Sequence, residues 1–203
     1  TGRMYEVIYQ WSEGRDEPLA EAMQAAERAV AADRDNPMAL TALGFACSLM
    51  GERERAVAVL ERAISENPSS ALAYWSLGAT LSTAGRPDDA IPMVEKAIRL
   101  SPQDPLMNEF LFTIGSSHFL AGRYEDAVQF AQKSLDMKSD QPGAWRVLAA
   151  ANALIGKIDE AKKALRQMIR LAPNLTEDRL RVFLRDSEAK LYIEGLRLAG
   201  WNN

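Results

Sequence analysis

The sequence predicts an all-α protein, a right-handed α-solenoid of helix-turn-helix repeats with a C-terminal capping helix pair. Three observations predict this fold class. Small residues recur in columns spaced 34, 37 and 34 residues apart, the residues between the columns are apolar at helical spacing, and the last 28 residues break the period. A fixed period of this length is typical of repeats that bury their apolar faces only by stacking on one another.

Each column predicts one feature of the repeat. A left-handed residue that ends the first helix accounts for the glycine column Gly51, Gly85, Gly122 and Gly156. Close approach of the second helix accounts for glycines inside the first helix, where glycine costs about 1 kcal/mol; these are Gly44, Gly78 and Gly115. The small residues expected to face them are Ala56, Ala90 and Ala127, from an alanine column that continues at Ala161. The second helix is expected to stop at Pro68, Pro102 and Pro173.

In chain order, the register gives a solenoid over 1–175 and capping helices over 176–203. The repeats fall at about 3–36, 37–70, 71–107, 108–141 and 142–175, and the first of them is weak because Glu17-Pro18 replaces its turn glycine. The repeat at 37–70 is expected to hold helices over about 39–50 and 53–66. In the tail, Thr176 is expected to cap one helix, and Asp186 or Ser187 a last helix that ends at Gly200. The tail is expected to cover the terminal face of the solenoid.

Composition excludes several classes of function. The net charge of −4 argues against nucleic-acid binding, and no apolar run reaches the length of a membrane span. One cysteine and one histidine exclude a disulfide framework and a multi-histidine metal site. The chain is therefore expected to be cytoplasmic, without metal or cofactor. It begins with Thr1, so we expect it to be a piece of a longer protein.

No catalytic motif emerges from the sequence, so this chain is not expected to be an enzyme. Cys47 and His118 could suggest a thiol–imidazole pair, but they occupy one column two repeats apart, where core packing is expected. Acidic pairs such as Asp88-Asp89 fall at the start of second helices, where they complement the helix dipole.

The pattern resembles the tetratricopeptide repeat, most fully over 74–90 (YWSLGATLSTAGRPDDA) and 114–127 (IGSSHFLAGRYEDA). The resemblance covers about 170 residues and implies a concave groove, lined by the first helices, that binds a protein or peptide segment. Carried over to this chain, the groove positions are Trp11, Thr41, Phe45, Trp75, Ala79, Phe112, Ser116 and Arg146, with Glu109 and Phe119 beside them. Some of these side chains could instead be buried between adjacent first helices.

The mostly apolar groove favours an amphipathic or apolar segment, supplied by a partner or by the same protein in cis. The family's terminal-carboxylate clamp needs lysine, arginine and asparagine, whereas the matching positions are Thr41, Ala42, Trp75, Ser76, Phe112 and Thr113. Three alternatives stay open: a small-molecule or lipid sensor using the same aromatic groove, a homodimer, and a free-standing adaptor.

Two segments carry a closer resemblance. Leu100 to Leu106 with Ser116 to Ala127, and the ending Leu191 to Gly200, resemble the C-terminal repeat regions of bacterial class III adenylate cyclases. Winged-helix transcriptional activators carry a similar region. The resemblance implies a regulatory or scaffolding module of a larger signalling protein. It transfers no catalytic role, because nothing in the chain matches the cyclase's metal-binding aspartates.

Overall fold

Every regular element is a helix across residues 17–202, the part of the chain that the computed structural model describes. The helices follow one another as α2 (Glu17–Ala32), α3 (Pro37–Leu49), α4 (Arg53–Glu66), α5 (Ala71–Thr83), α6 (Pro87–Leu100), α7 (Met107–Leu120), α8 (Tyr124–Met137), α9 (Pro142–Leu154), α10 (Ile158–Leu171), α11 (Glu177–Phe183) and α12 (Asp186–Leu198). Side chains at the loops start several of them. Asn36 and Ser70 cap α3 and α5 by accepting backbone N–H bonds.

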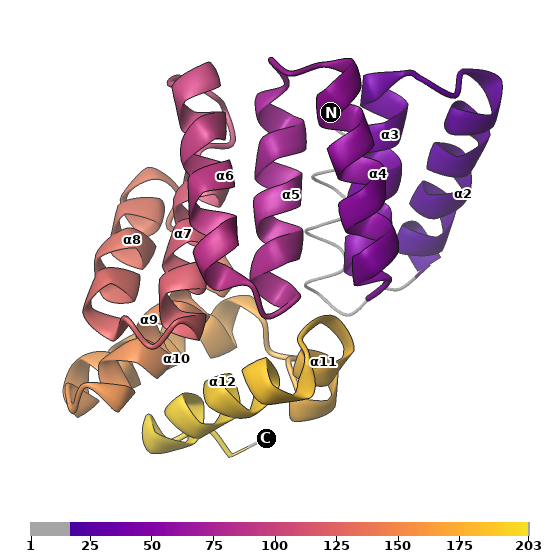
Figure 1. The fold of residues 1–203 in the computed structure, drawn as a ribbon. Coiled ribbons are helices and arrows are strands. Elements are labelled where there is room, and N and C mark those ends of the chain that lie inside the picture. The colour runs from indigo at the N-terminus through magenta and orange to yellow at the C-terminus, as the bar shows by residue number, and fades with distance from the viewer. Residues whose placement is uncertain (1–16, 203) are drawn as a thin grey trace.

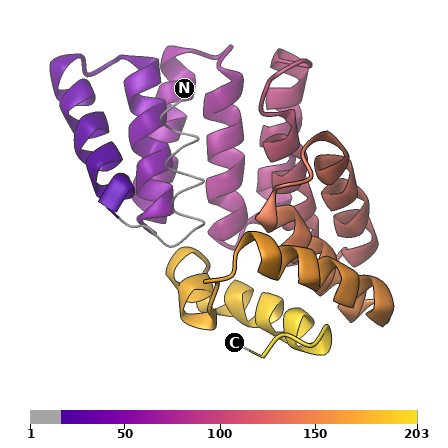
Figure 2. The ribbon, with the colours of Figure 1, turned by 180° about the vertical axis from the view of Figure 1, so that it is seen from behind.

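The helices form consecutive pairs that stack into a right-handed solenoid, as predicted. Figure 1 shows α2 to α8 standing side by side in one row, and Figure 2 shows the same row from behind. The first helices of successive pairs, α3, α5, α7 and α9, contact one another more closely than the second helices do. The first helices therefore line the inner side of the curve, and the second helices form its outer layer.

Both glycine columns do what their spacing predicts. The turn glycines Gly51, Gly85, Gly122 and Gly156 have φ between 76° and 80°. An ideal Cβ on Gly78, inside α5, would lie 2.5 Å from Val94 Cγ2 and 3.0 Å from the Ala90 carbonyl oxygen of α6. The alanines of the facing column are fully buried. Close approach within each helix pair thus explains why glycine stands inside the first helices.

The N-terminal repeat is described only in part. Its second helix is α2, which begins at Glu17 in place of a glycine turn, and Leu19, Met23 and Ala26 bury its inner face. Residues 1–16, which hold the first helix expected for this repeat, lie outside the described residues. At the next junction α7 begins at Met107, one residue before the expected repeat boundary.

The C-terminal helices depart from the expected arrangement. Thr176 caps α11 as predicted, with its side chain accepting the Arg179 N–H, but the predicted caps of the last helix are wrong. Arg185 is the N-cap of α12 and makes no side-chain cap bond, while Asp186 lies inside the first turn and pairs with Lys190. The helix ends at Leu198, before the left-handed Gly200.

The position of α12 is also not that of a cover confined to the terminal face. It packs against α9 and reaches back to α7, and in Figure 1 it lies below the row of repeats with its axis transverse to theirs. Small residues make this crossing close, since a Cβ on Gly195 would lie 2.8 Å from the backbone oxygen of Ala150 on α9. The last helix therefore lies on the side of the first helices, where the groove is.

Candidate functional site

A pocket of about 230 Å³ opens on the inner side of the solenoid. Its walls come from α3, α5, α7 and α9, from the loop between α8 and α9, and from the end of α10 through α11. The expected groove residues that line it are Phe45, Trp75, Ala79, Phe112, Ser116 and Arg146. The fold thus brings six side chains from four first helices to one cavity.

The aromatic residues form the apolar wall of this pocket. The rings of Phe45 and Trp75 stack with their centroids 5.4 Å apart, and Trp75 meets Phe110 at 5.9 Å. The Trp75 indole N–H donates to Thr113 Oγ1 at 2.9 Å. Only 3% of Trp75 and 6% of Phe45 is exposed, so these two side chains are mainly core residues that present one edge to the pocket. Phe112 is more open and packs over Gly143 at the start of α9.

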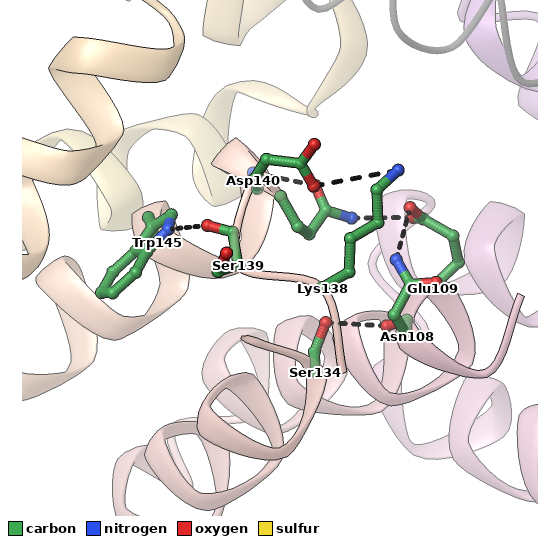
Figure 3. Close-up of polar contacts among 9 residues, drawn as sticks. Asn108, Glu109, Ser134, Lys138, Ser139, Asp140 and Trp145 are labelled. Atoms are coloured by element: carbon green, nitrogen blue, oxygen red, sulfur yellow. Dashed lines mark hydrogen bonds and ion pairs between the residues drawn. The ribbon is translucent and has the colours of Figure 1, made fainter. Parts of the chain in front are cut away.

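A carboxylate lies at another end of the pocket, on the first turn of α7. Glu109 accepts one hydrogen bond from the amide of Asn108 at 3.1 Å and another from that of Gln141 at 2.8 Å (Figure 3). Lys138 lies nearby, with its ammonium nitrogen 4.0 Å from Asp140 Oδ1. Burial raises the pKa of the Glu109 carboxyl, while Lys138 and the two amides act in the opposite direction.

Helix α12 contacts two pocket residues, Ser116 and Arg146, through Tyr192. Tyr192 of α12 is fully buried, its hydroxyl lies 2.9 Å from Ser116 Oγ, and its ring stacks on Phe119 at 4.2 Å. The Arg146 guanidinium lies over the Tyr192 ring, 5.0 Å from its centroid. Burial raises the pKa of the Tyr192 hydroxyl and lowers that of Arg146. Phe119, expected beside the groove, is therefore covered by the chain's own last helix.

One expected groove residue of the described part of the chain, Thr41, does not contribute to the pocket. Thr41 is 2% exposed, its hydroxyl donates to the Pro37 carbonyl at 2.7 Å, and it lies outside the pocket lining. It faces its own helix because a threonine hydroxyl readily bonds the carbonyl four residues earlier. Trp11 lies outside the described residues.

Sequence reasoning missed the part of the pocket that does not come from first helices. Lys138, Asp140 and Gln141 belong to the loop between α8 and α9, while Leu175 and Leu184 flank α11. The repeat register assigns no groove role to loop or tail positions. The sequence feature that marks this loop is Ser139, which stands where the repeat pattern expects a proline.

The two isolated candidates for chemistry lie elsewhere. Cys47 is fully buried, and burial raises its thiol pKa to about 11, which leaves it protonated at neutral pH. His118 accepts a hydrogen bond from Arg123 Nε at 2.9 Å and stacks on Phe130. Burial, followed by the nearby Arg123 charge, lowers the pKa of His118. Both side chains thus serve packing and local bonding.

Residues 17–202 offer neither a membrane span nor a metal site. No described helix combines the length and apolar character needed to cross a bilayer. The described part of the chain also holds no cluster of three or more side chains suited to bind a metal ion.

Comparison with known proteins identifies the repeat. Models of the tetratricopeptide repeat match residues 50–105, 80–142 and 118–180, which together cover 50–180. No curated protein sequence matches the chain.

Solved structures give the same picture of the fold. PilW, described as a type IV pilus biogenesis factor, is 20% identical over 95% of this chain and 89% of its own, with a TM-score of 0.70. TTC0263, a thermophilic protein of Thermus thermophilus, is 19% identical over 97% and 98%, with a TM-score of 0.66. YrrB, described as having an unusual peptide-binding site, is 18% identical over 87% and 93%, with a TM-score of 0.56. At these identities the likeness shows the fold alone.

Proposed function

Since this chain belongs to the tetratricopeptide-repeat family, we propose that it is a protein-interaction module that binds a partner segment in its concave pocket. The observation that carries the proposal is the convergence of Phe45, Trp75 and Phe112 on one cavity of the inner face. Apolar cavities with a few polar groups at their edges are typical binding sites. The positions that match the family's terminal-carboxylate clamp, among them Thr41, Trp75 and Phe112, carry no basic side chain, so the proposed segment binds through its apolar side chains.

The size of the pocket favours a peptide over a small molecule. Pockets for drug-sized ligands span roughly 300–1,000 Å³, whereas this one measures about 230 Å³. It suits one or two anchoring side chains of an amphipathic helix or an extended segment. A metabolite or lipid sensor is the alternative, and a thermal-shift screen tests it, because a bound ligand raises the unfolding temperature.

The closer resemblance supports a proposal about context. The segments that resemble cyclase C-terminal regions contact each other in the fold, since Ser116 lies in one and its partner Tyr192 in the other. We therefore propose that the chain is a regulatory arm of a cytoplasmic signalling protein with a cyclase or winged-helix domain. Sequencing the coding region upstream of Thr1 tests this, and a lone start codon there would leave a free-standing adaptor.

Filling the pocket tests the binding proposal. Ala79 lines the cavity on α5, and Ala79→Leu would place an apolar branched side chain in it. Peptides selected on the wild-type chain from a random dodecamer display library are expected to bind this variant at least about tenfold more weakly, a loss of about 1.4 kcal/mol. Ala58→Leu is the matched control, since Ala58 is exposed on α4 outside the pocket. Equal affinity of the selected peptides for both variants would refute the site.

A further inference from the structure

One end of the pocket is acidic, because Glu109 and Asp140 lie there beside the apolar wall. Glu109 projects from α7 into the same cavity as Trp75 and Phe112, and its two recorded hydrogen bonds come from neutral amides. A carboxylate held among apolar groups is costly unless a cation compensates it. The raised pKa of Glu109 has that same cause.

The charges around Glu109 leave it incompletely compensated. Lys138 and Asp140 are the other charged residues lining this end, and Lys138 lies 4.0 Å from Asp140. Two carboxylates and one ammonium leave one net negative charge. More than half of the Lys138 side chain is exposed, so its ammonium can leave the pocket at little cost.

The arginines that line the pocket belong to other elements. Arg146 is on α9 and packs on Tyr192, beside Ser116, and Arg179 is on α11. Ser116 is seven residues further along α7 than Glu109, which corresponds to about 10 Å at the rise of an α-helix. The contact of Arg146 with Tyr192 therefore lies beside the part of α7 that is about two helical turns beyond Glu109.

We propose that the pocket selects a partner segment in which a large apolar side chain is followed closely by a lysine or arginine. This inference rests on the proposed function and names its partner's chemistry. The apolar side chain packs against the Trp75 and Phe112 wall, and the long stem of the basic residue extends along it. Its charged group pairs with the Glu109 carboxylate, while Lys138 stays with Asp140 or moves into solvent. The charge complementarity of the acidic end singles out a basic partner segment among the occupants of an apolar groove.

The test compares the same selected peptides in basic and neutral form. Fluorescein-labelled dodecamers selected on the wild-type chain are synthesised with the lysine or arginine retained and with glutamine in its place. The basic form is expected to bind the wild-type chain about tenfold more tightly, as a charge pair removed from water can contribute. Glu109→Gln is expected to bring this ratio to about one, whereas Lys138→Ala is expected to keep or increase it.

Two controls separate selectivity from folding and from net charge. Glu109→Gln removes a half-buried charge, so its unfolding midpoint at neutral pH is expected to equal or exceed that of the wild type. Glu95→Gln removes one carboxylate from the exposed face of α6, outside the pocket lining, and is expected to leave the peptide ratio unchanged.

The outcomes distinguish this inference from the function on which it rests. Selected peptides that are sensitive to Ala79→Leu but carry no basic preference, or an acidic one, would overturn the inference alone. Failure to select any peptide, or selected peptides insensitive to Ala79→Leu, would overturn both. Self-association of the chain that Ala79→Leu abolishes would make a second copy the occupant and would likewise overturn the inference.

Discussion

The contact between Tyr192 and Ser116 carries the most direct prediction about how the last helix is held. The Tyr192 hydroxyl is buried between α7 and α9, 2.9 Å from Ser116 Oγ, and the Arg146 guanidinium lies over the Tyr192 ring. Tyr192→Phe keeps the ring stacked on Phe119 and removes only the hydroxyl. The substitution therefore tests the polar part of the α12 contact without opening a large cavity.

The expected loss follows from the burial of the groups left behind. Removing one partner of a buried hydrogen bond costs about 1–3 kcal/mol, because the other partner keeps its desolvation penalty. For a chain of this size, each kcal/mol lowers the unfolding temperature by about 2–4 °C. Ser116→Ala is expected to cost a similar amount, and the double variant little more than either single one. The coupling energy should therefore be close to the cost of one single substitution, about 1–3 kcal/mol.

Urea unfolding followed by circular dichroism measures all four proteins of this cycle. Tyr74→Phe serves as the matched control, since Tyr74 is half-buried on α5 in a different apolar cluster. Additive losses within about 0.3 kcal/mol would refute the reasoning, because independent sites behave in that way. An unchanged midpoint for Tyr192→Phe would show that α12 does not pack on α7 as described.

Three further predictions concern packing and ionisation. Gly78→Ala gains about 1 kcal/mol of helix propensity, but its methyl group overpacks against Val94 at a cost of about 1–3 kcal/mol. Urea unfolding should therefore show Gly78→Ala to be less stable than Gly115→Ala, because the atom nearest to a Cβ on Gly115 is 3.1 Å away. The opposite order of stability would contradict the described packing. Burial keeps the Cys47 thiol away from solvent and raises its pKa to about 11. At pH 8 the thiol should therefore react with a disulfide reagent more than about 100-fold faster in the unfolded chain than in the native chain. Equal rates in the two states would contradict its burial. Because the pKa of Glu109 is raised in the folded state, the native state binds more protons than the unfolded state between the folded and unfolded pKa values. The free energy of unfolding should therefore fall as the pH rises through that window. Urea titrations should show a shallower fall for Glu109→Gln than for the wild type, and identical pH profiles would contradict the raised pKa.

The repeat architecture could be predicted from the sequence because each repeat carries its own local signals. Gly85 and Gly122 stop their first helices with φ near 76° and 77°, as a left-handed helix end requires. Pro68 follows α4 within two residues. Such signals depend on neighbouring residues, and the constant period repeats them often enough to fix the register.

The position of α12 could not be predicted in this way. Tyr192 and Ser116 are 76 residues apart, and neither the helical period of the tail nor that of α7 specifies that they meet. The polar end of the pocket could not be predicted for the same reason, since Gln141 lies in a loop and bonds Glu109, which is 32 residues away in the sequence. Three of the expected aromatic residues, Phe45, Trp75 and Phe112, line the pocket, but Trp75 is almost completely buried there because the first helices pack closely enough to cover it.

That burial changes which variants are informative about binding. Replacing Trp75 with alanine would remove a core side chain at a cost of about 3–5 kcal/mol, so loss of binding would not be separable from loss of folding. Ala79 and Phe112 line the same pocket and are more open. Substitutions at these two positions alter the cavity while the wall behind it stays in place.

The indole N–H signal of Trp75 tests the central claim, that the inner pocket is the site of partner binding. In a ¹⁵N correlation spectrum this signal reports the bond to Thr113 at the pocket wall, while Trp145 reports its bond to Ser139 on the loop and Trp201 the buried end of the chain. Adding a selected peptide is expected to shift the Trp75 signal and to leave that of Trp201 in place. A shift at Trp201 with an unchanged Trp75 signal would contradict the assignment of the pocket.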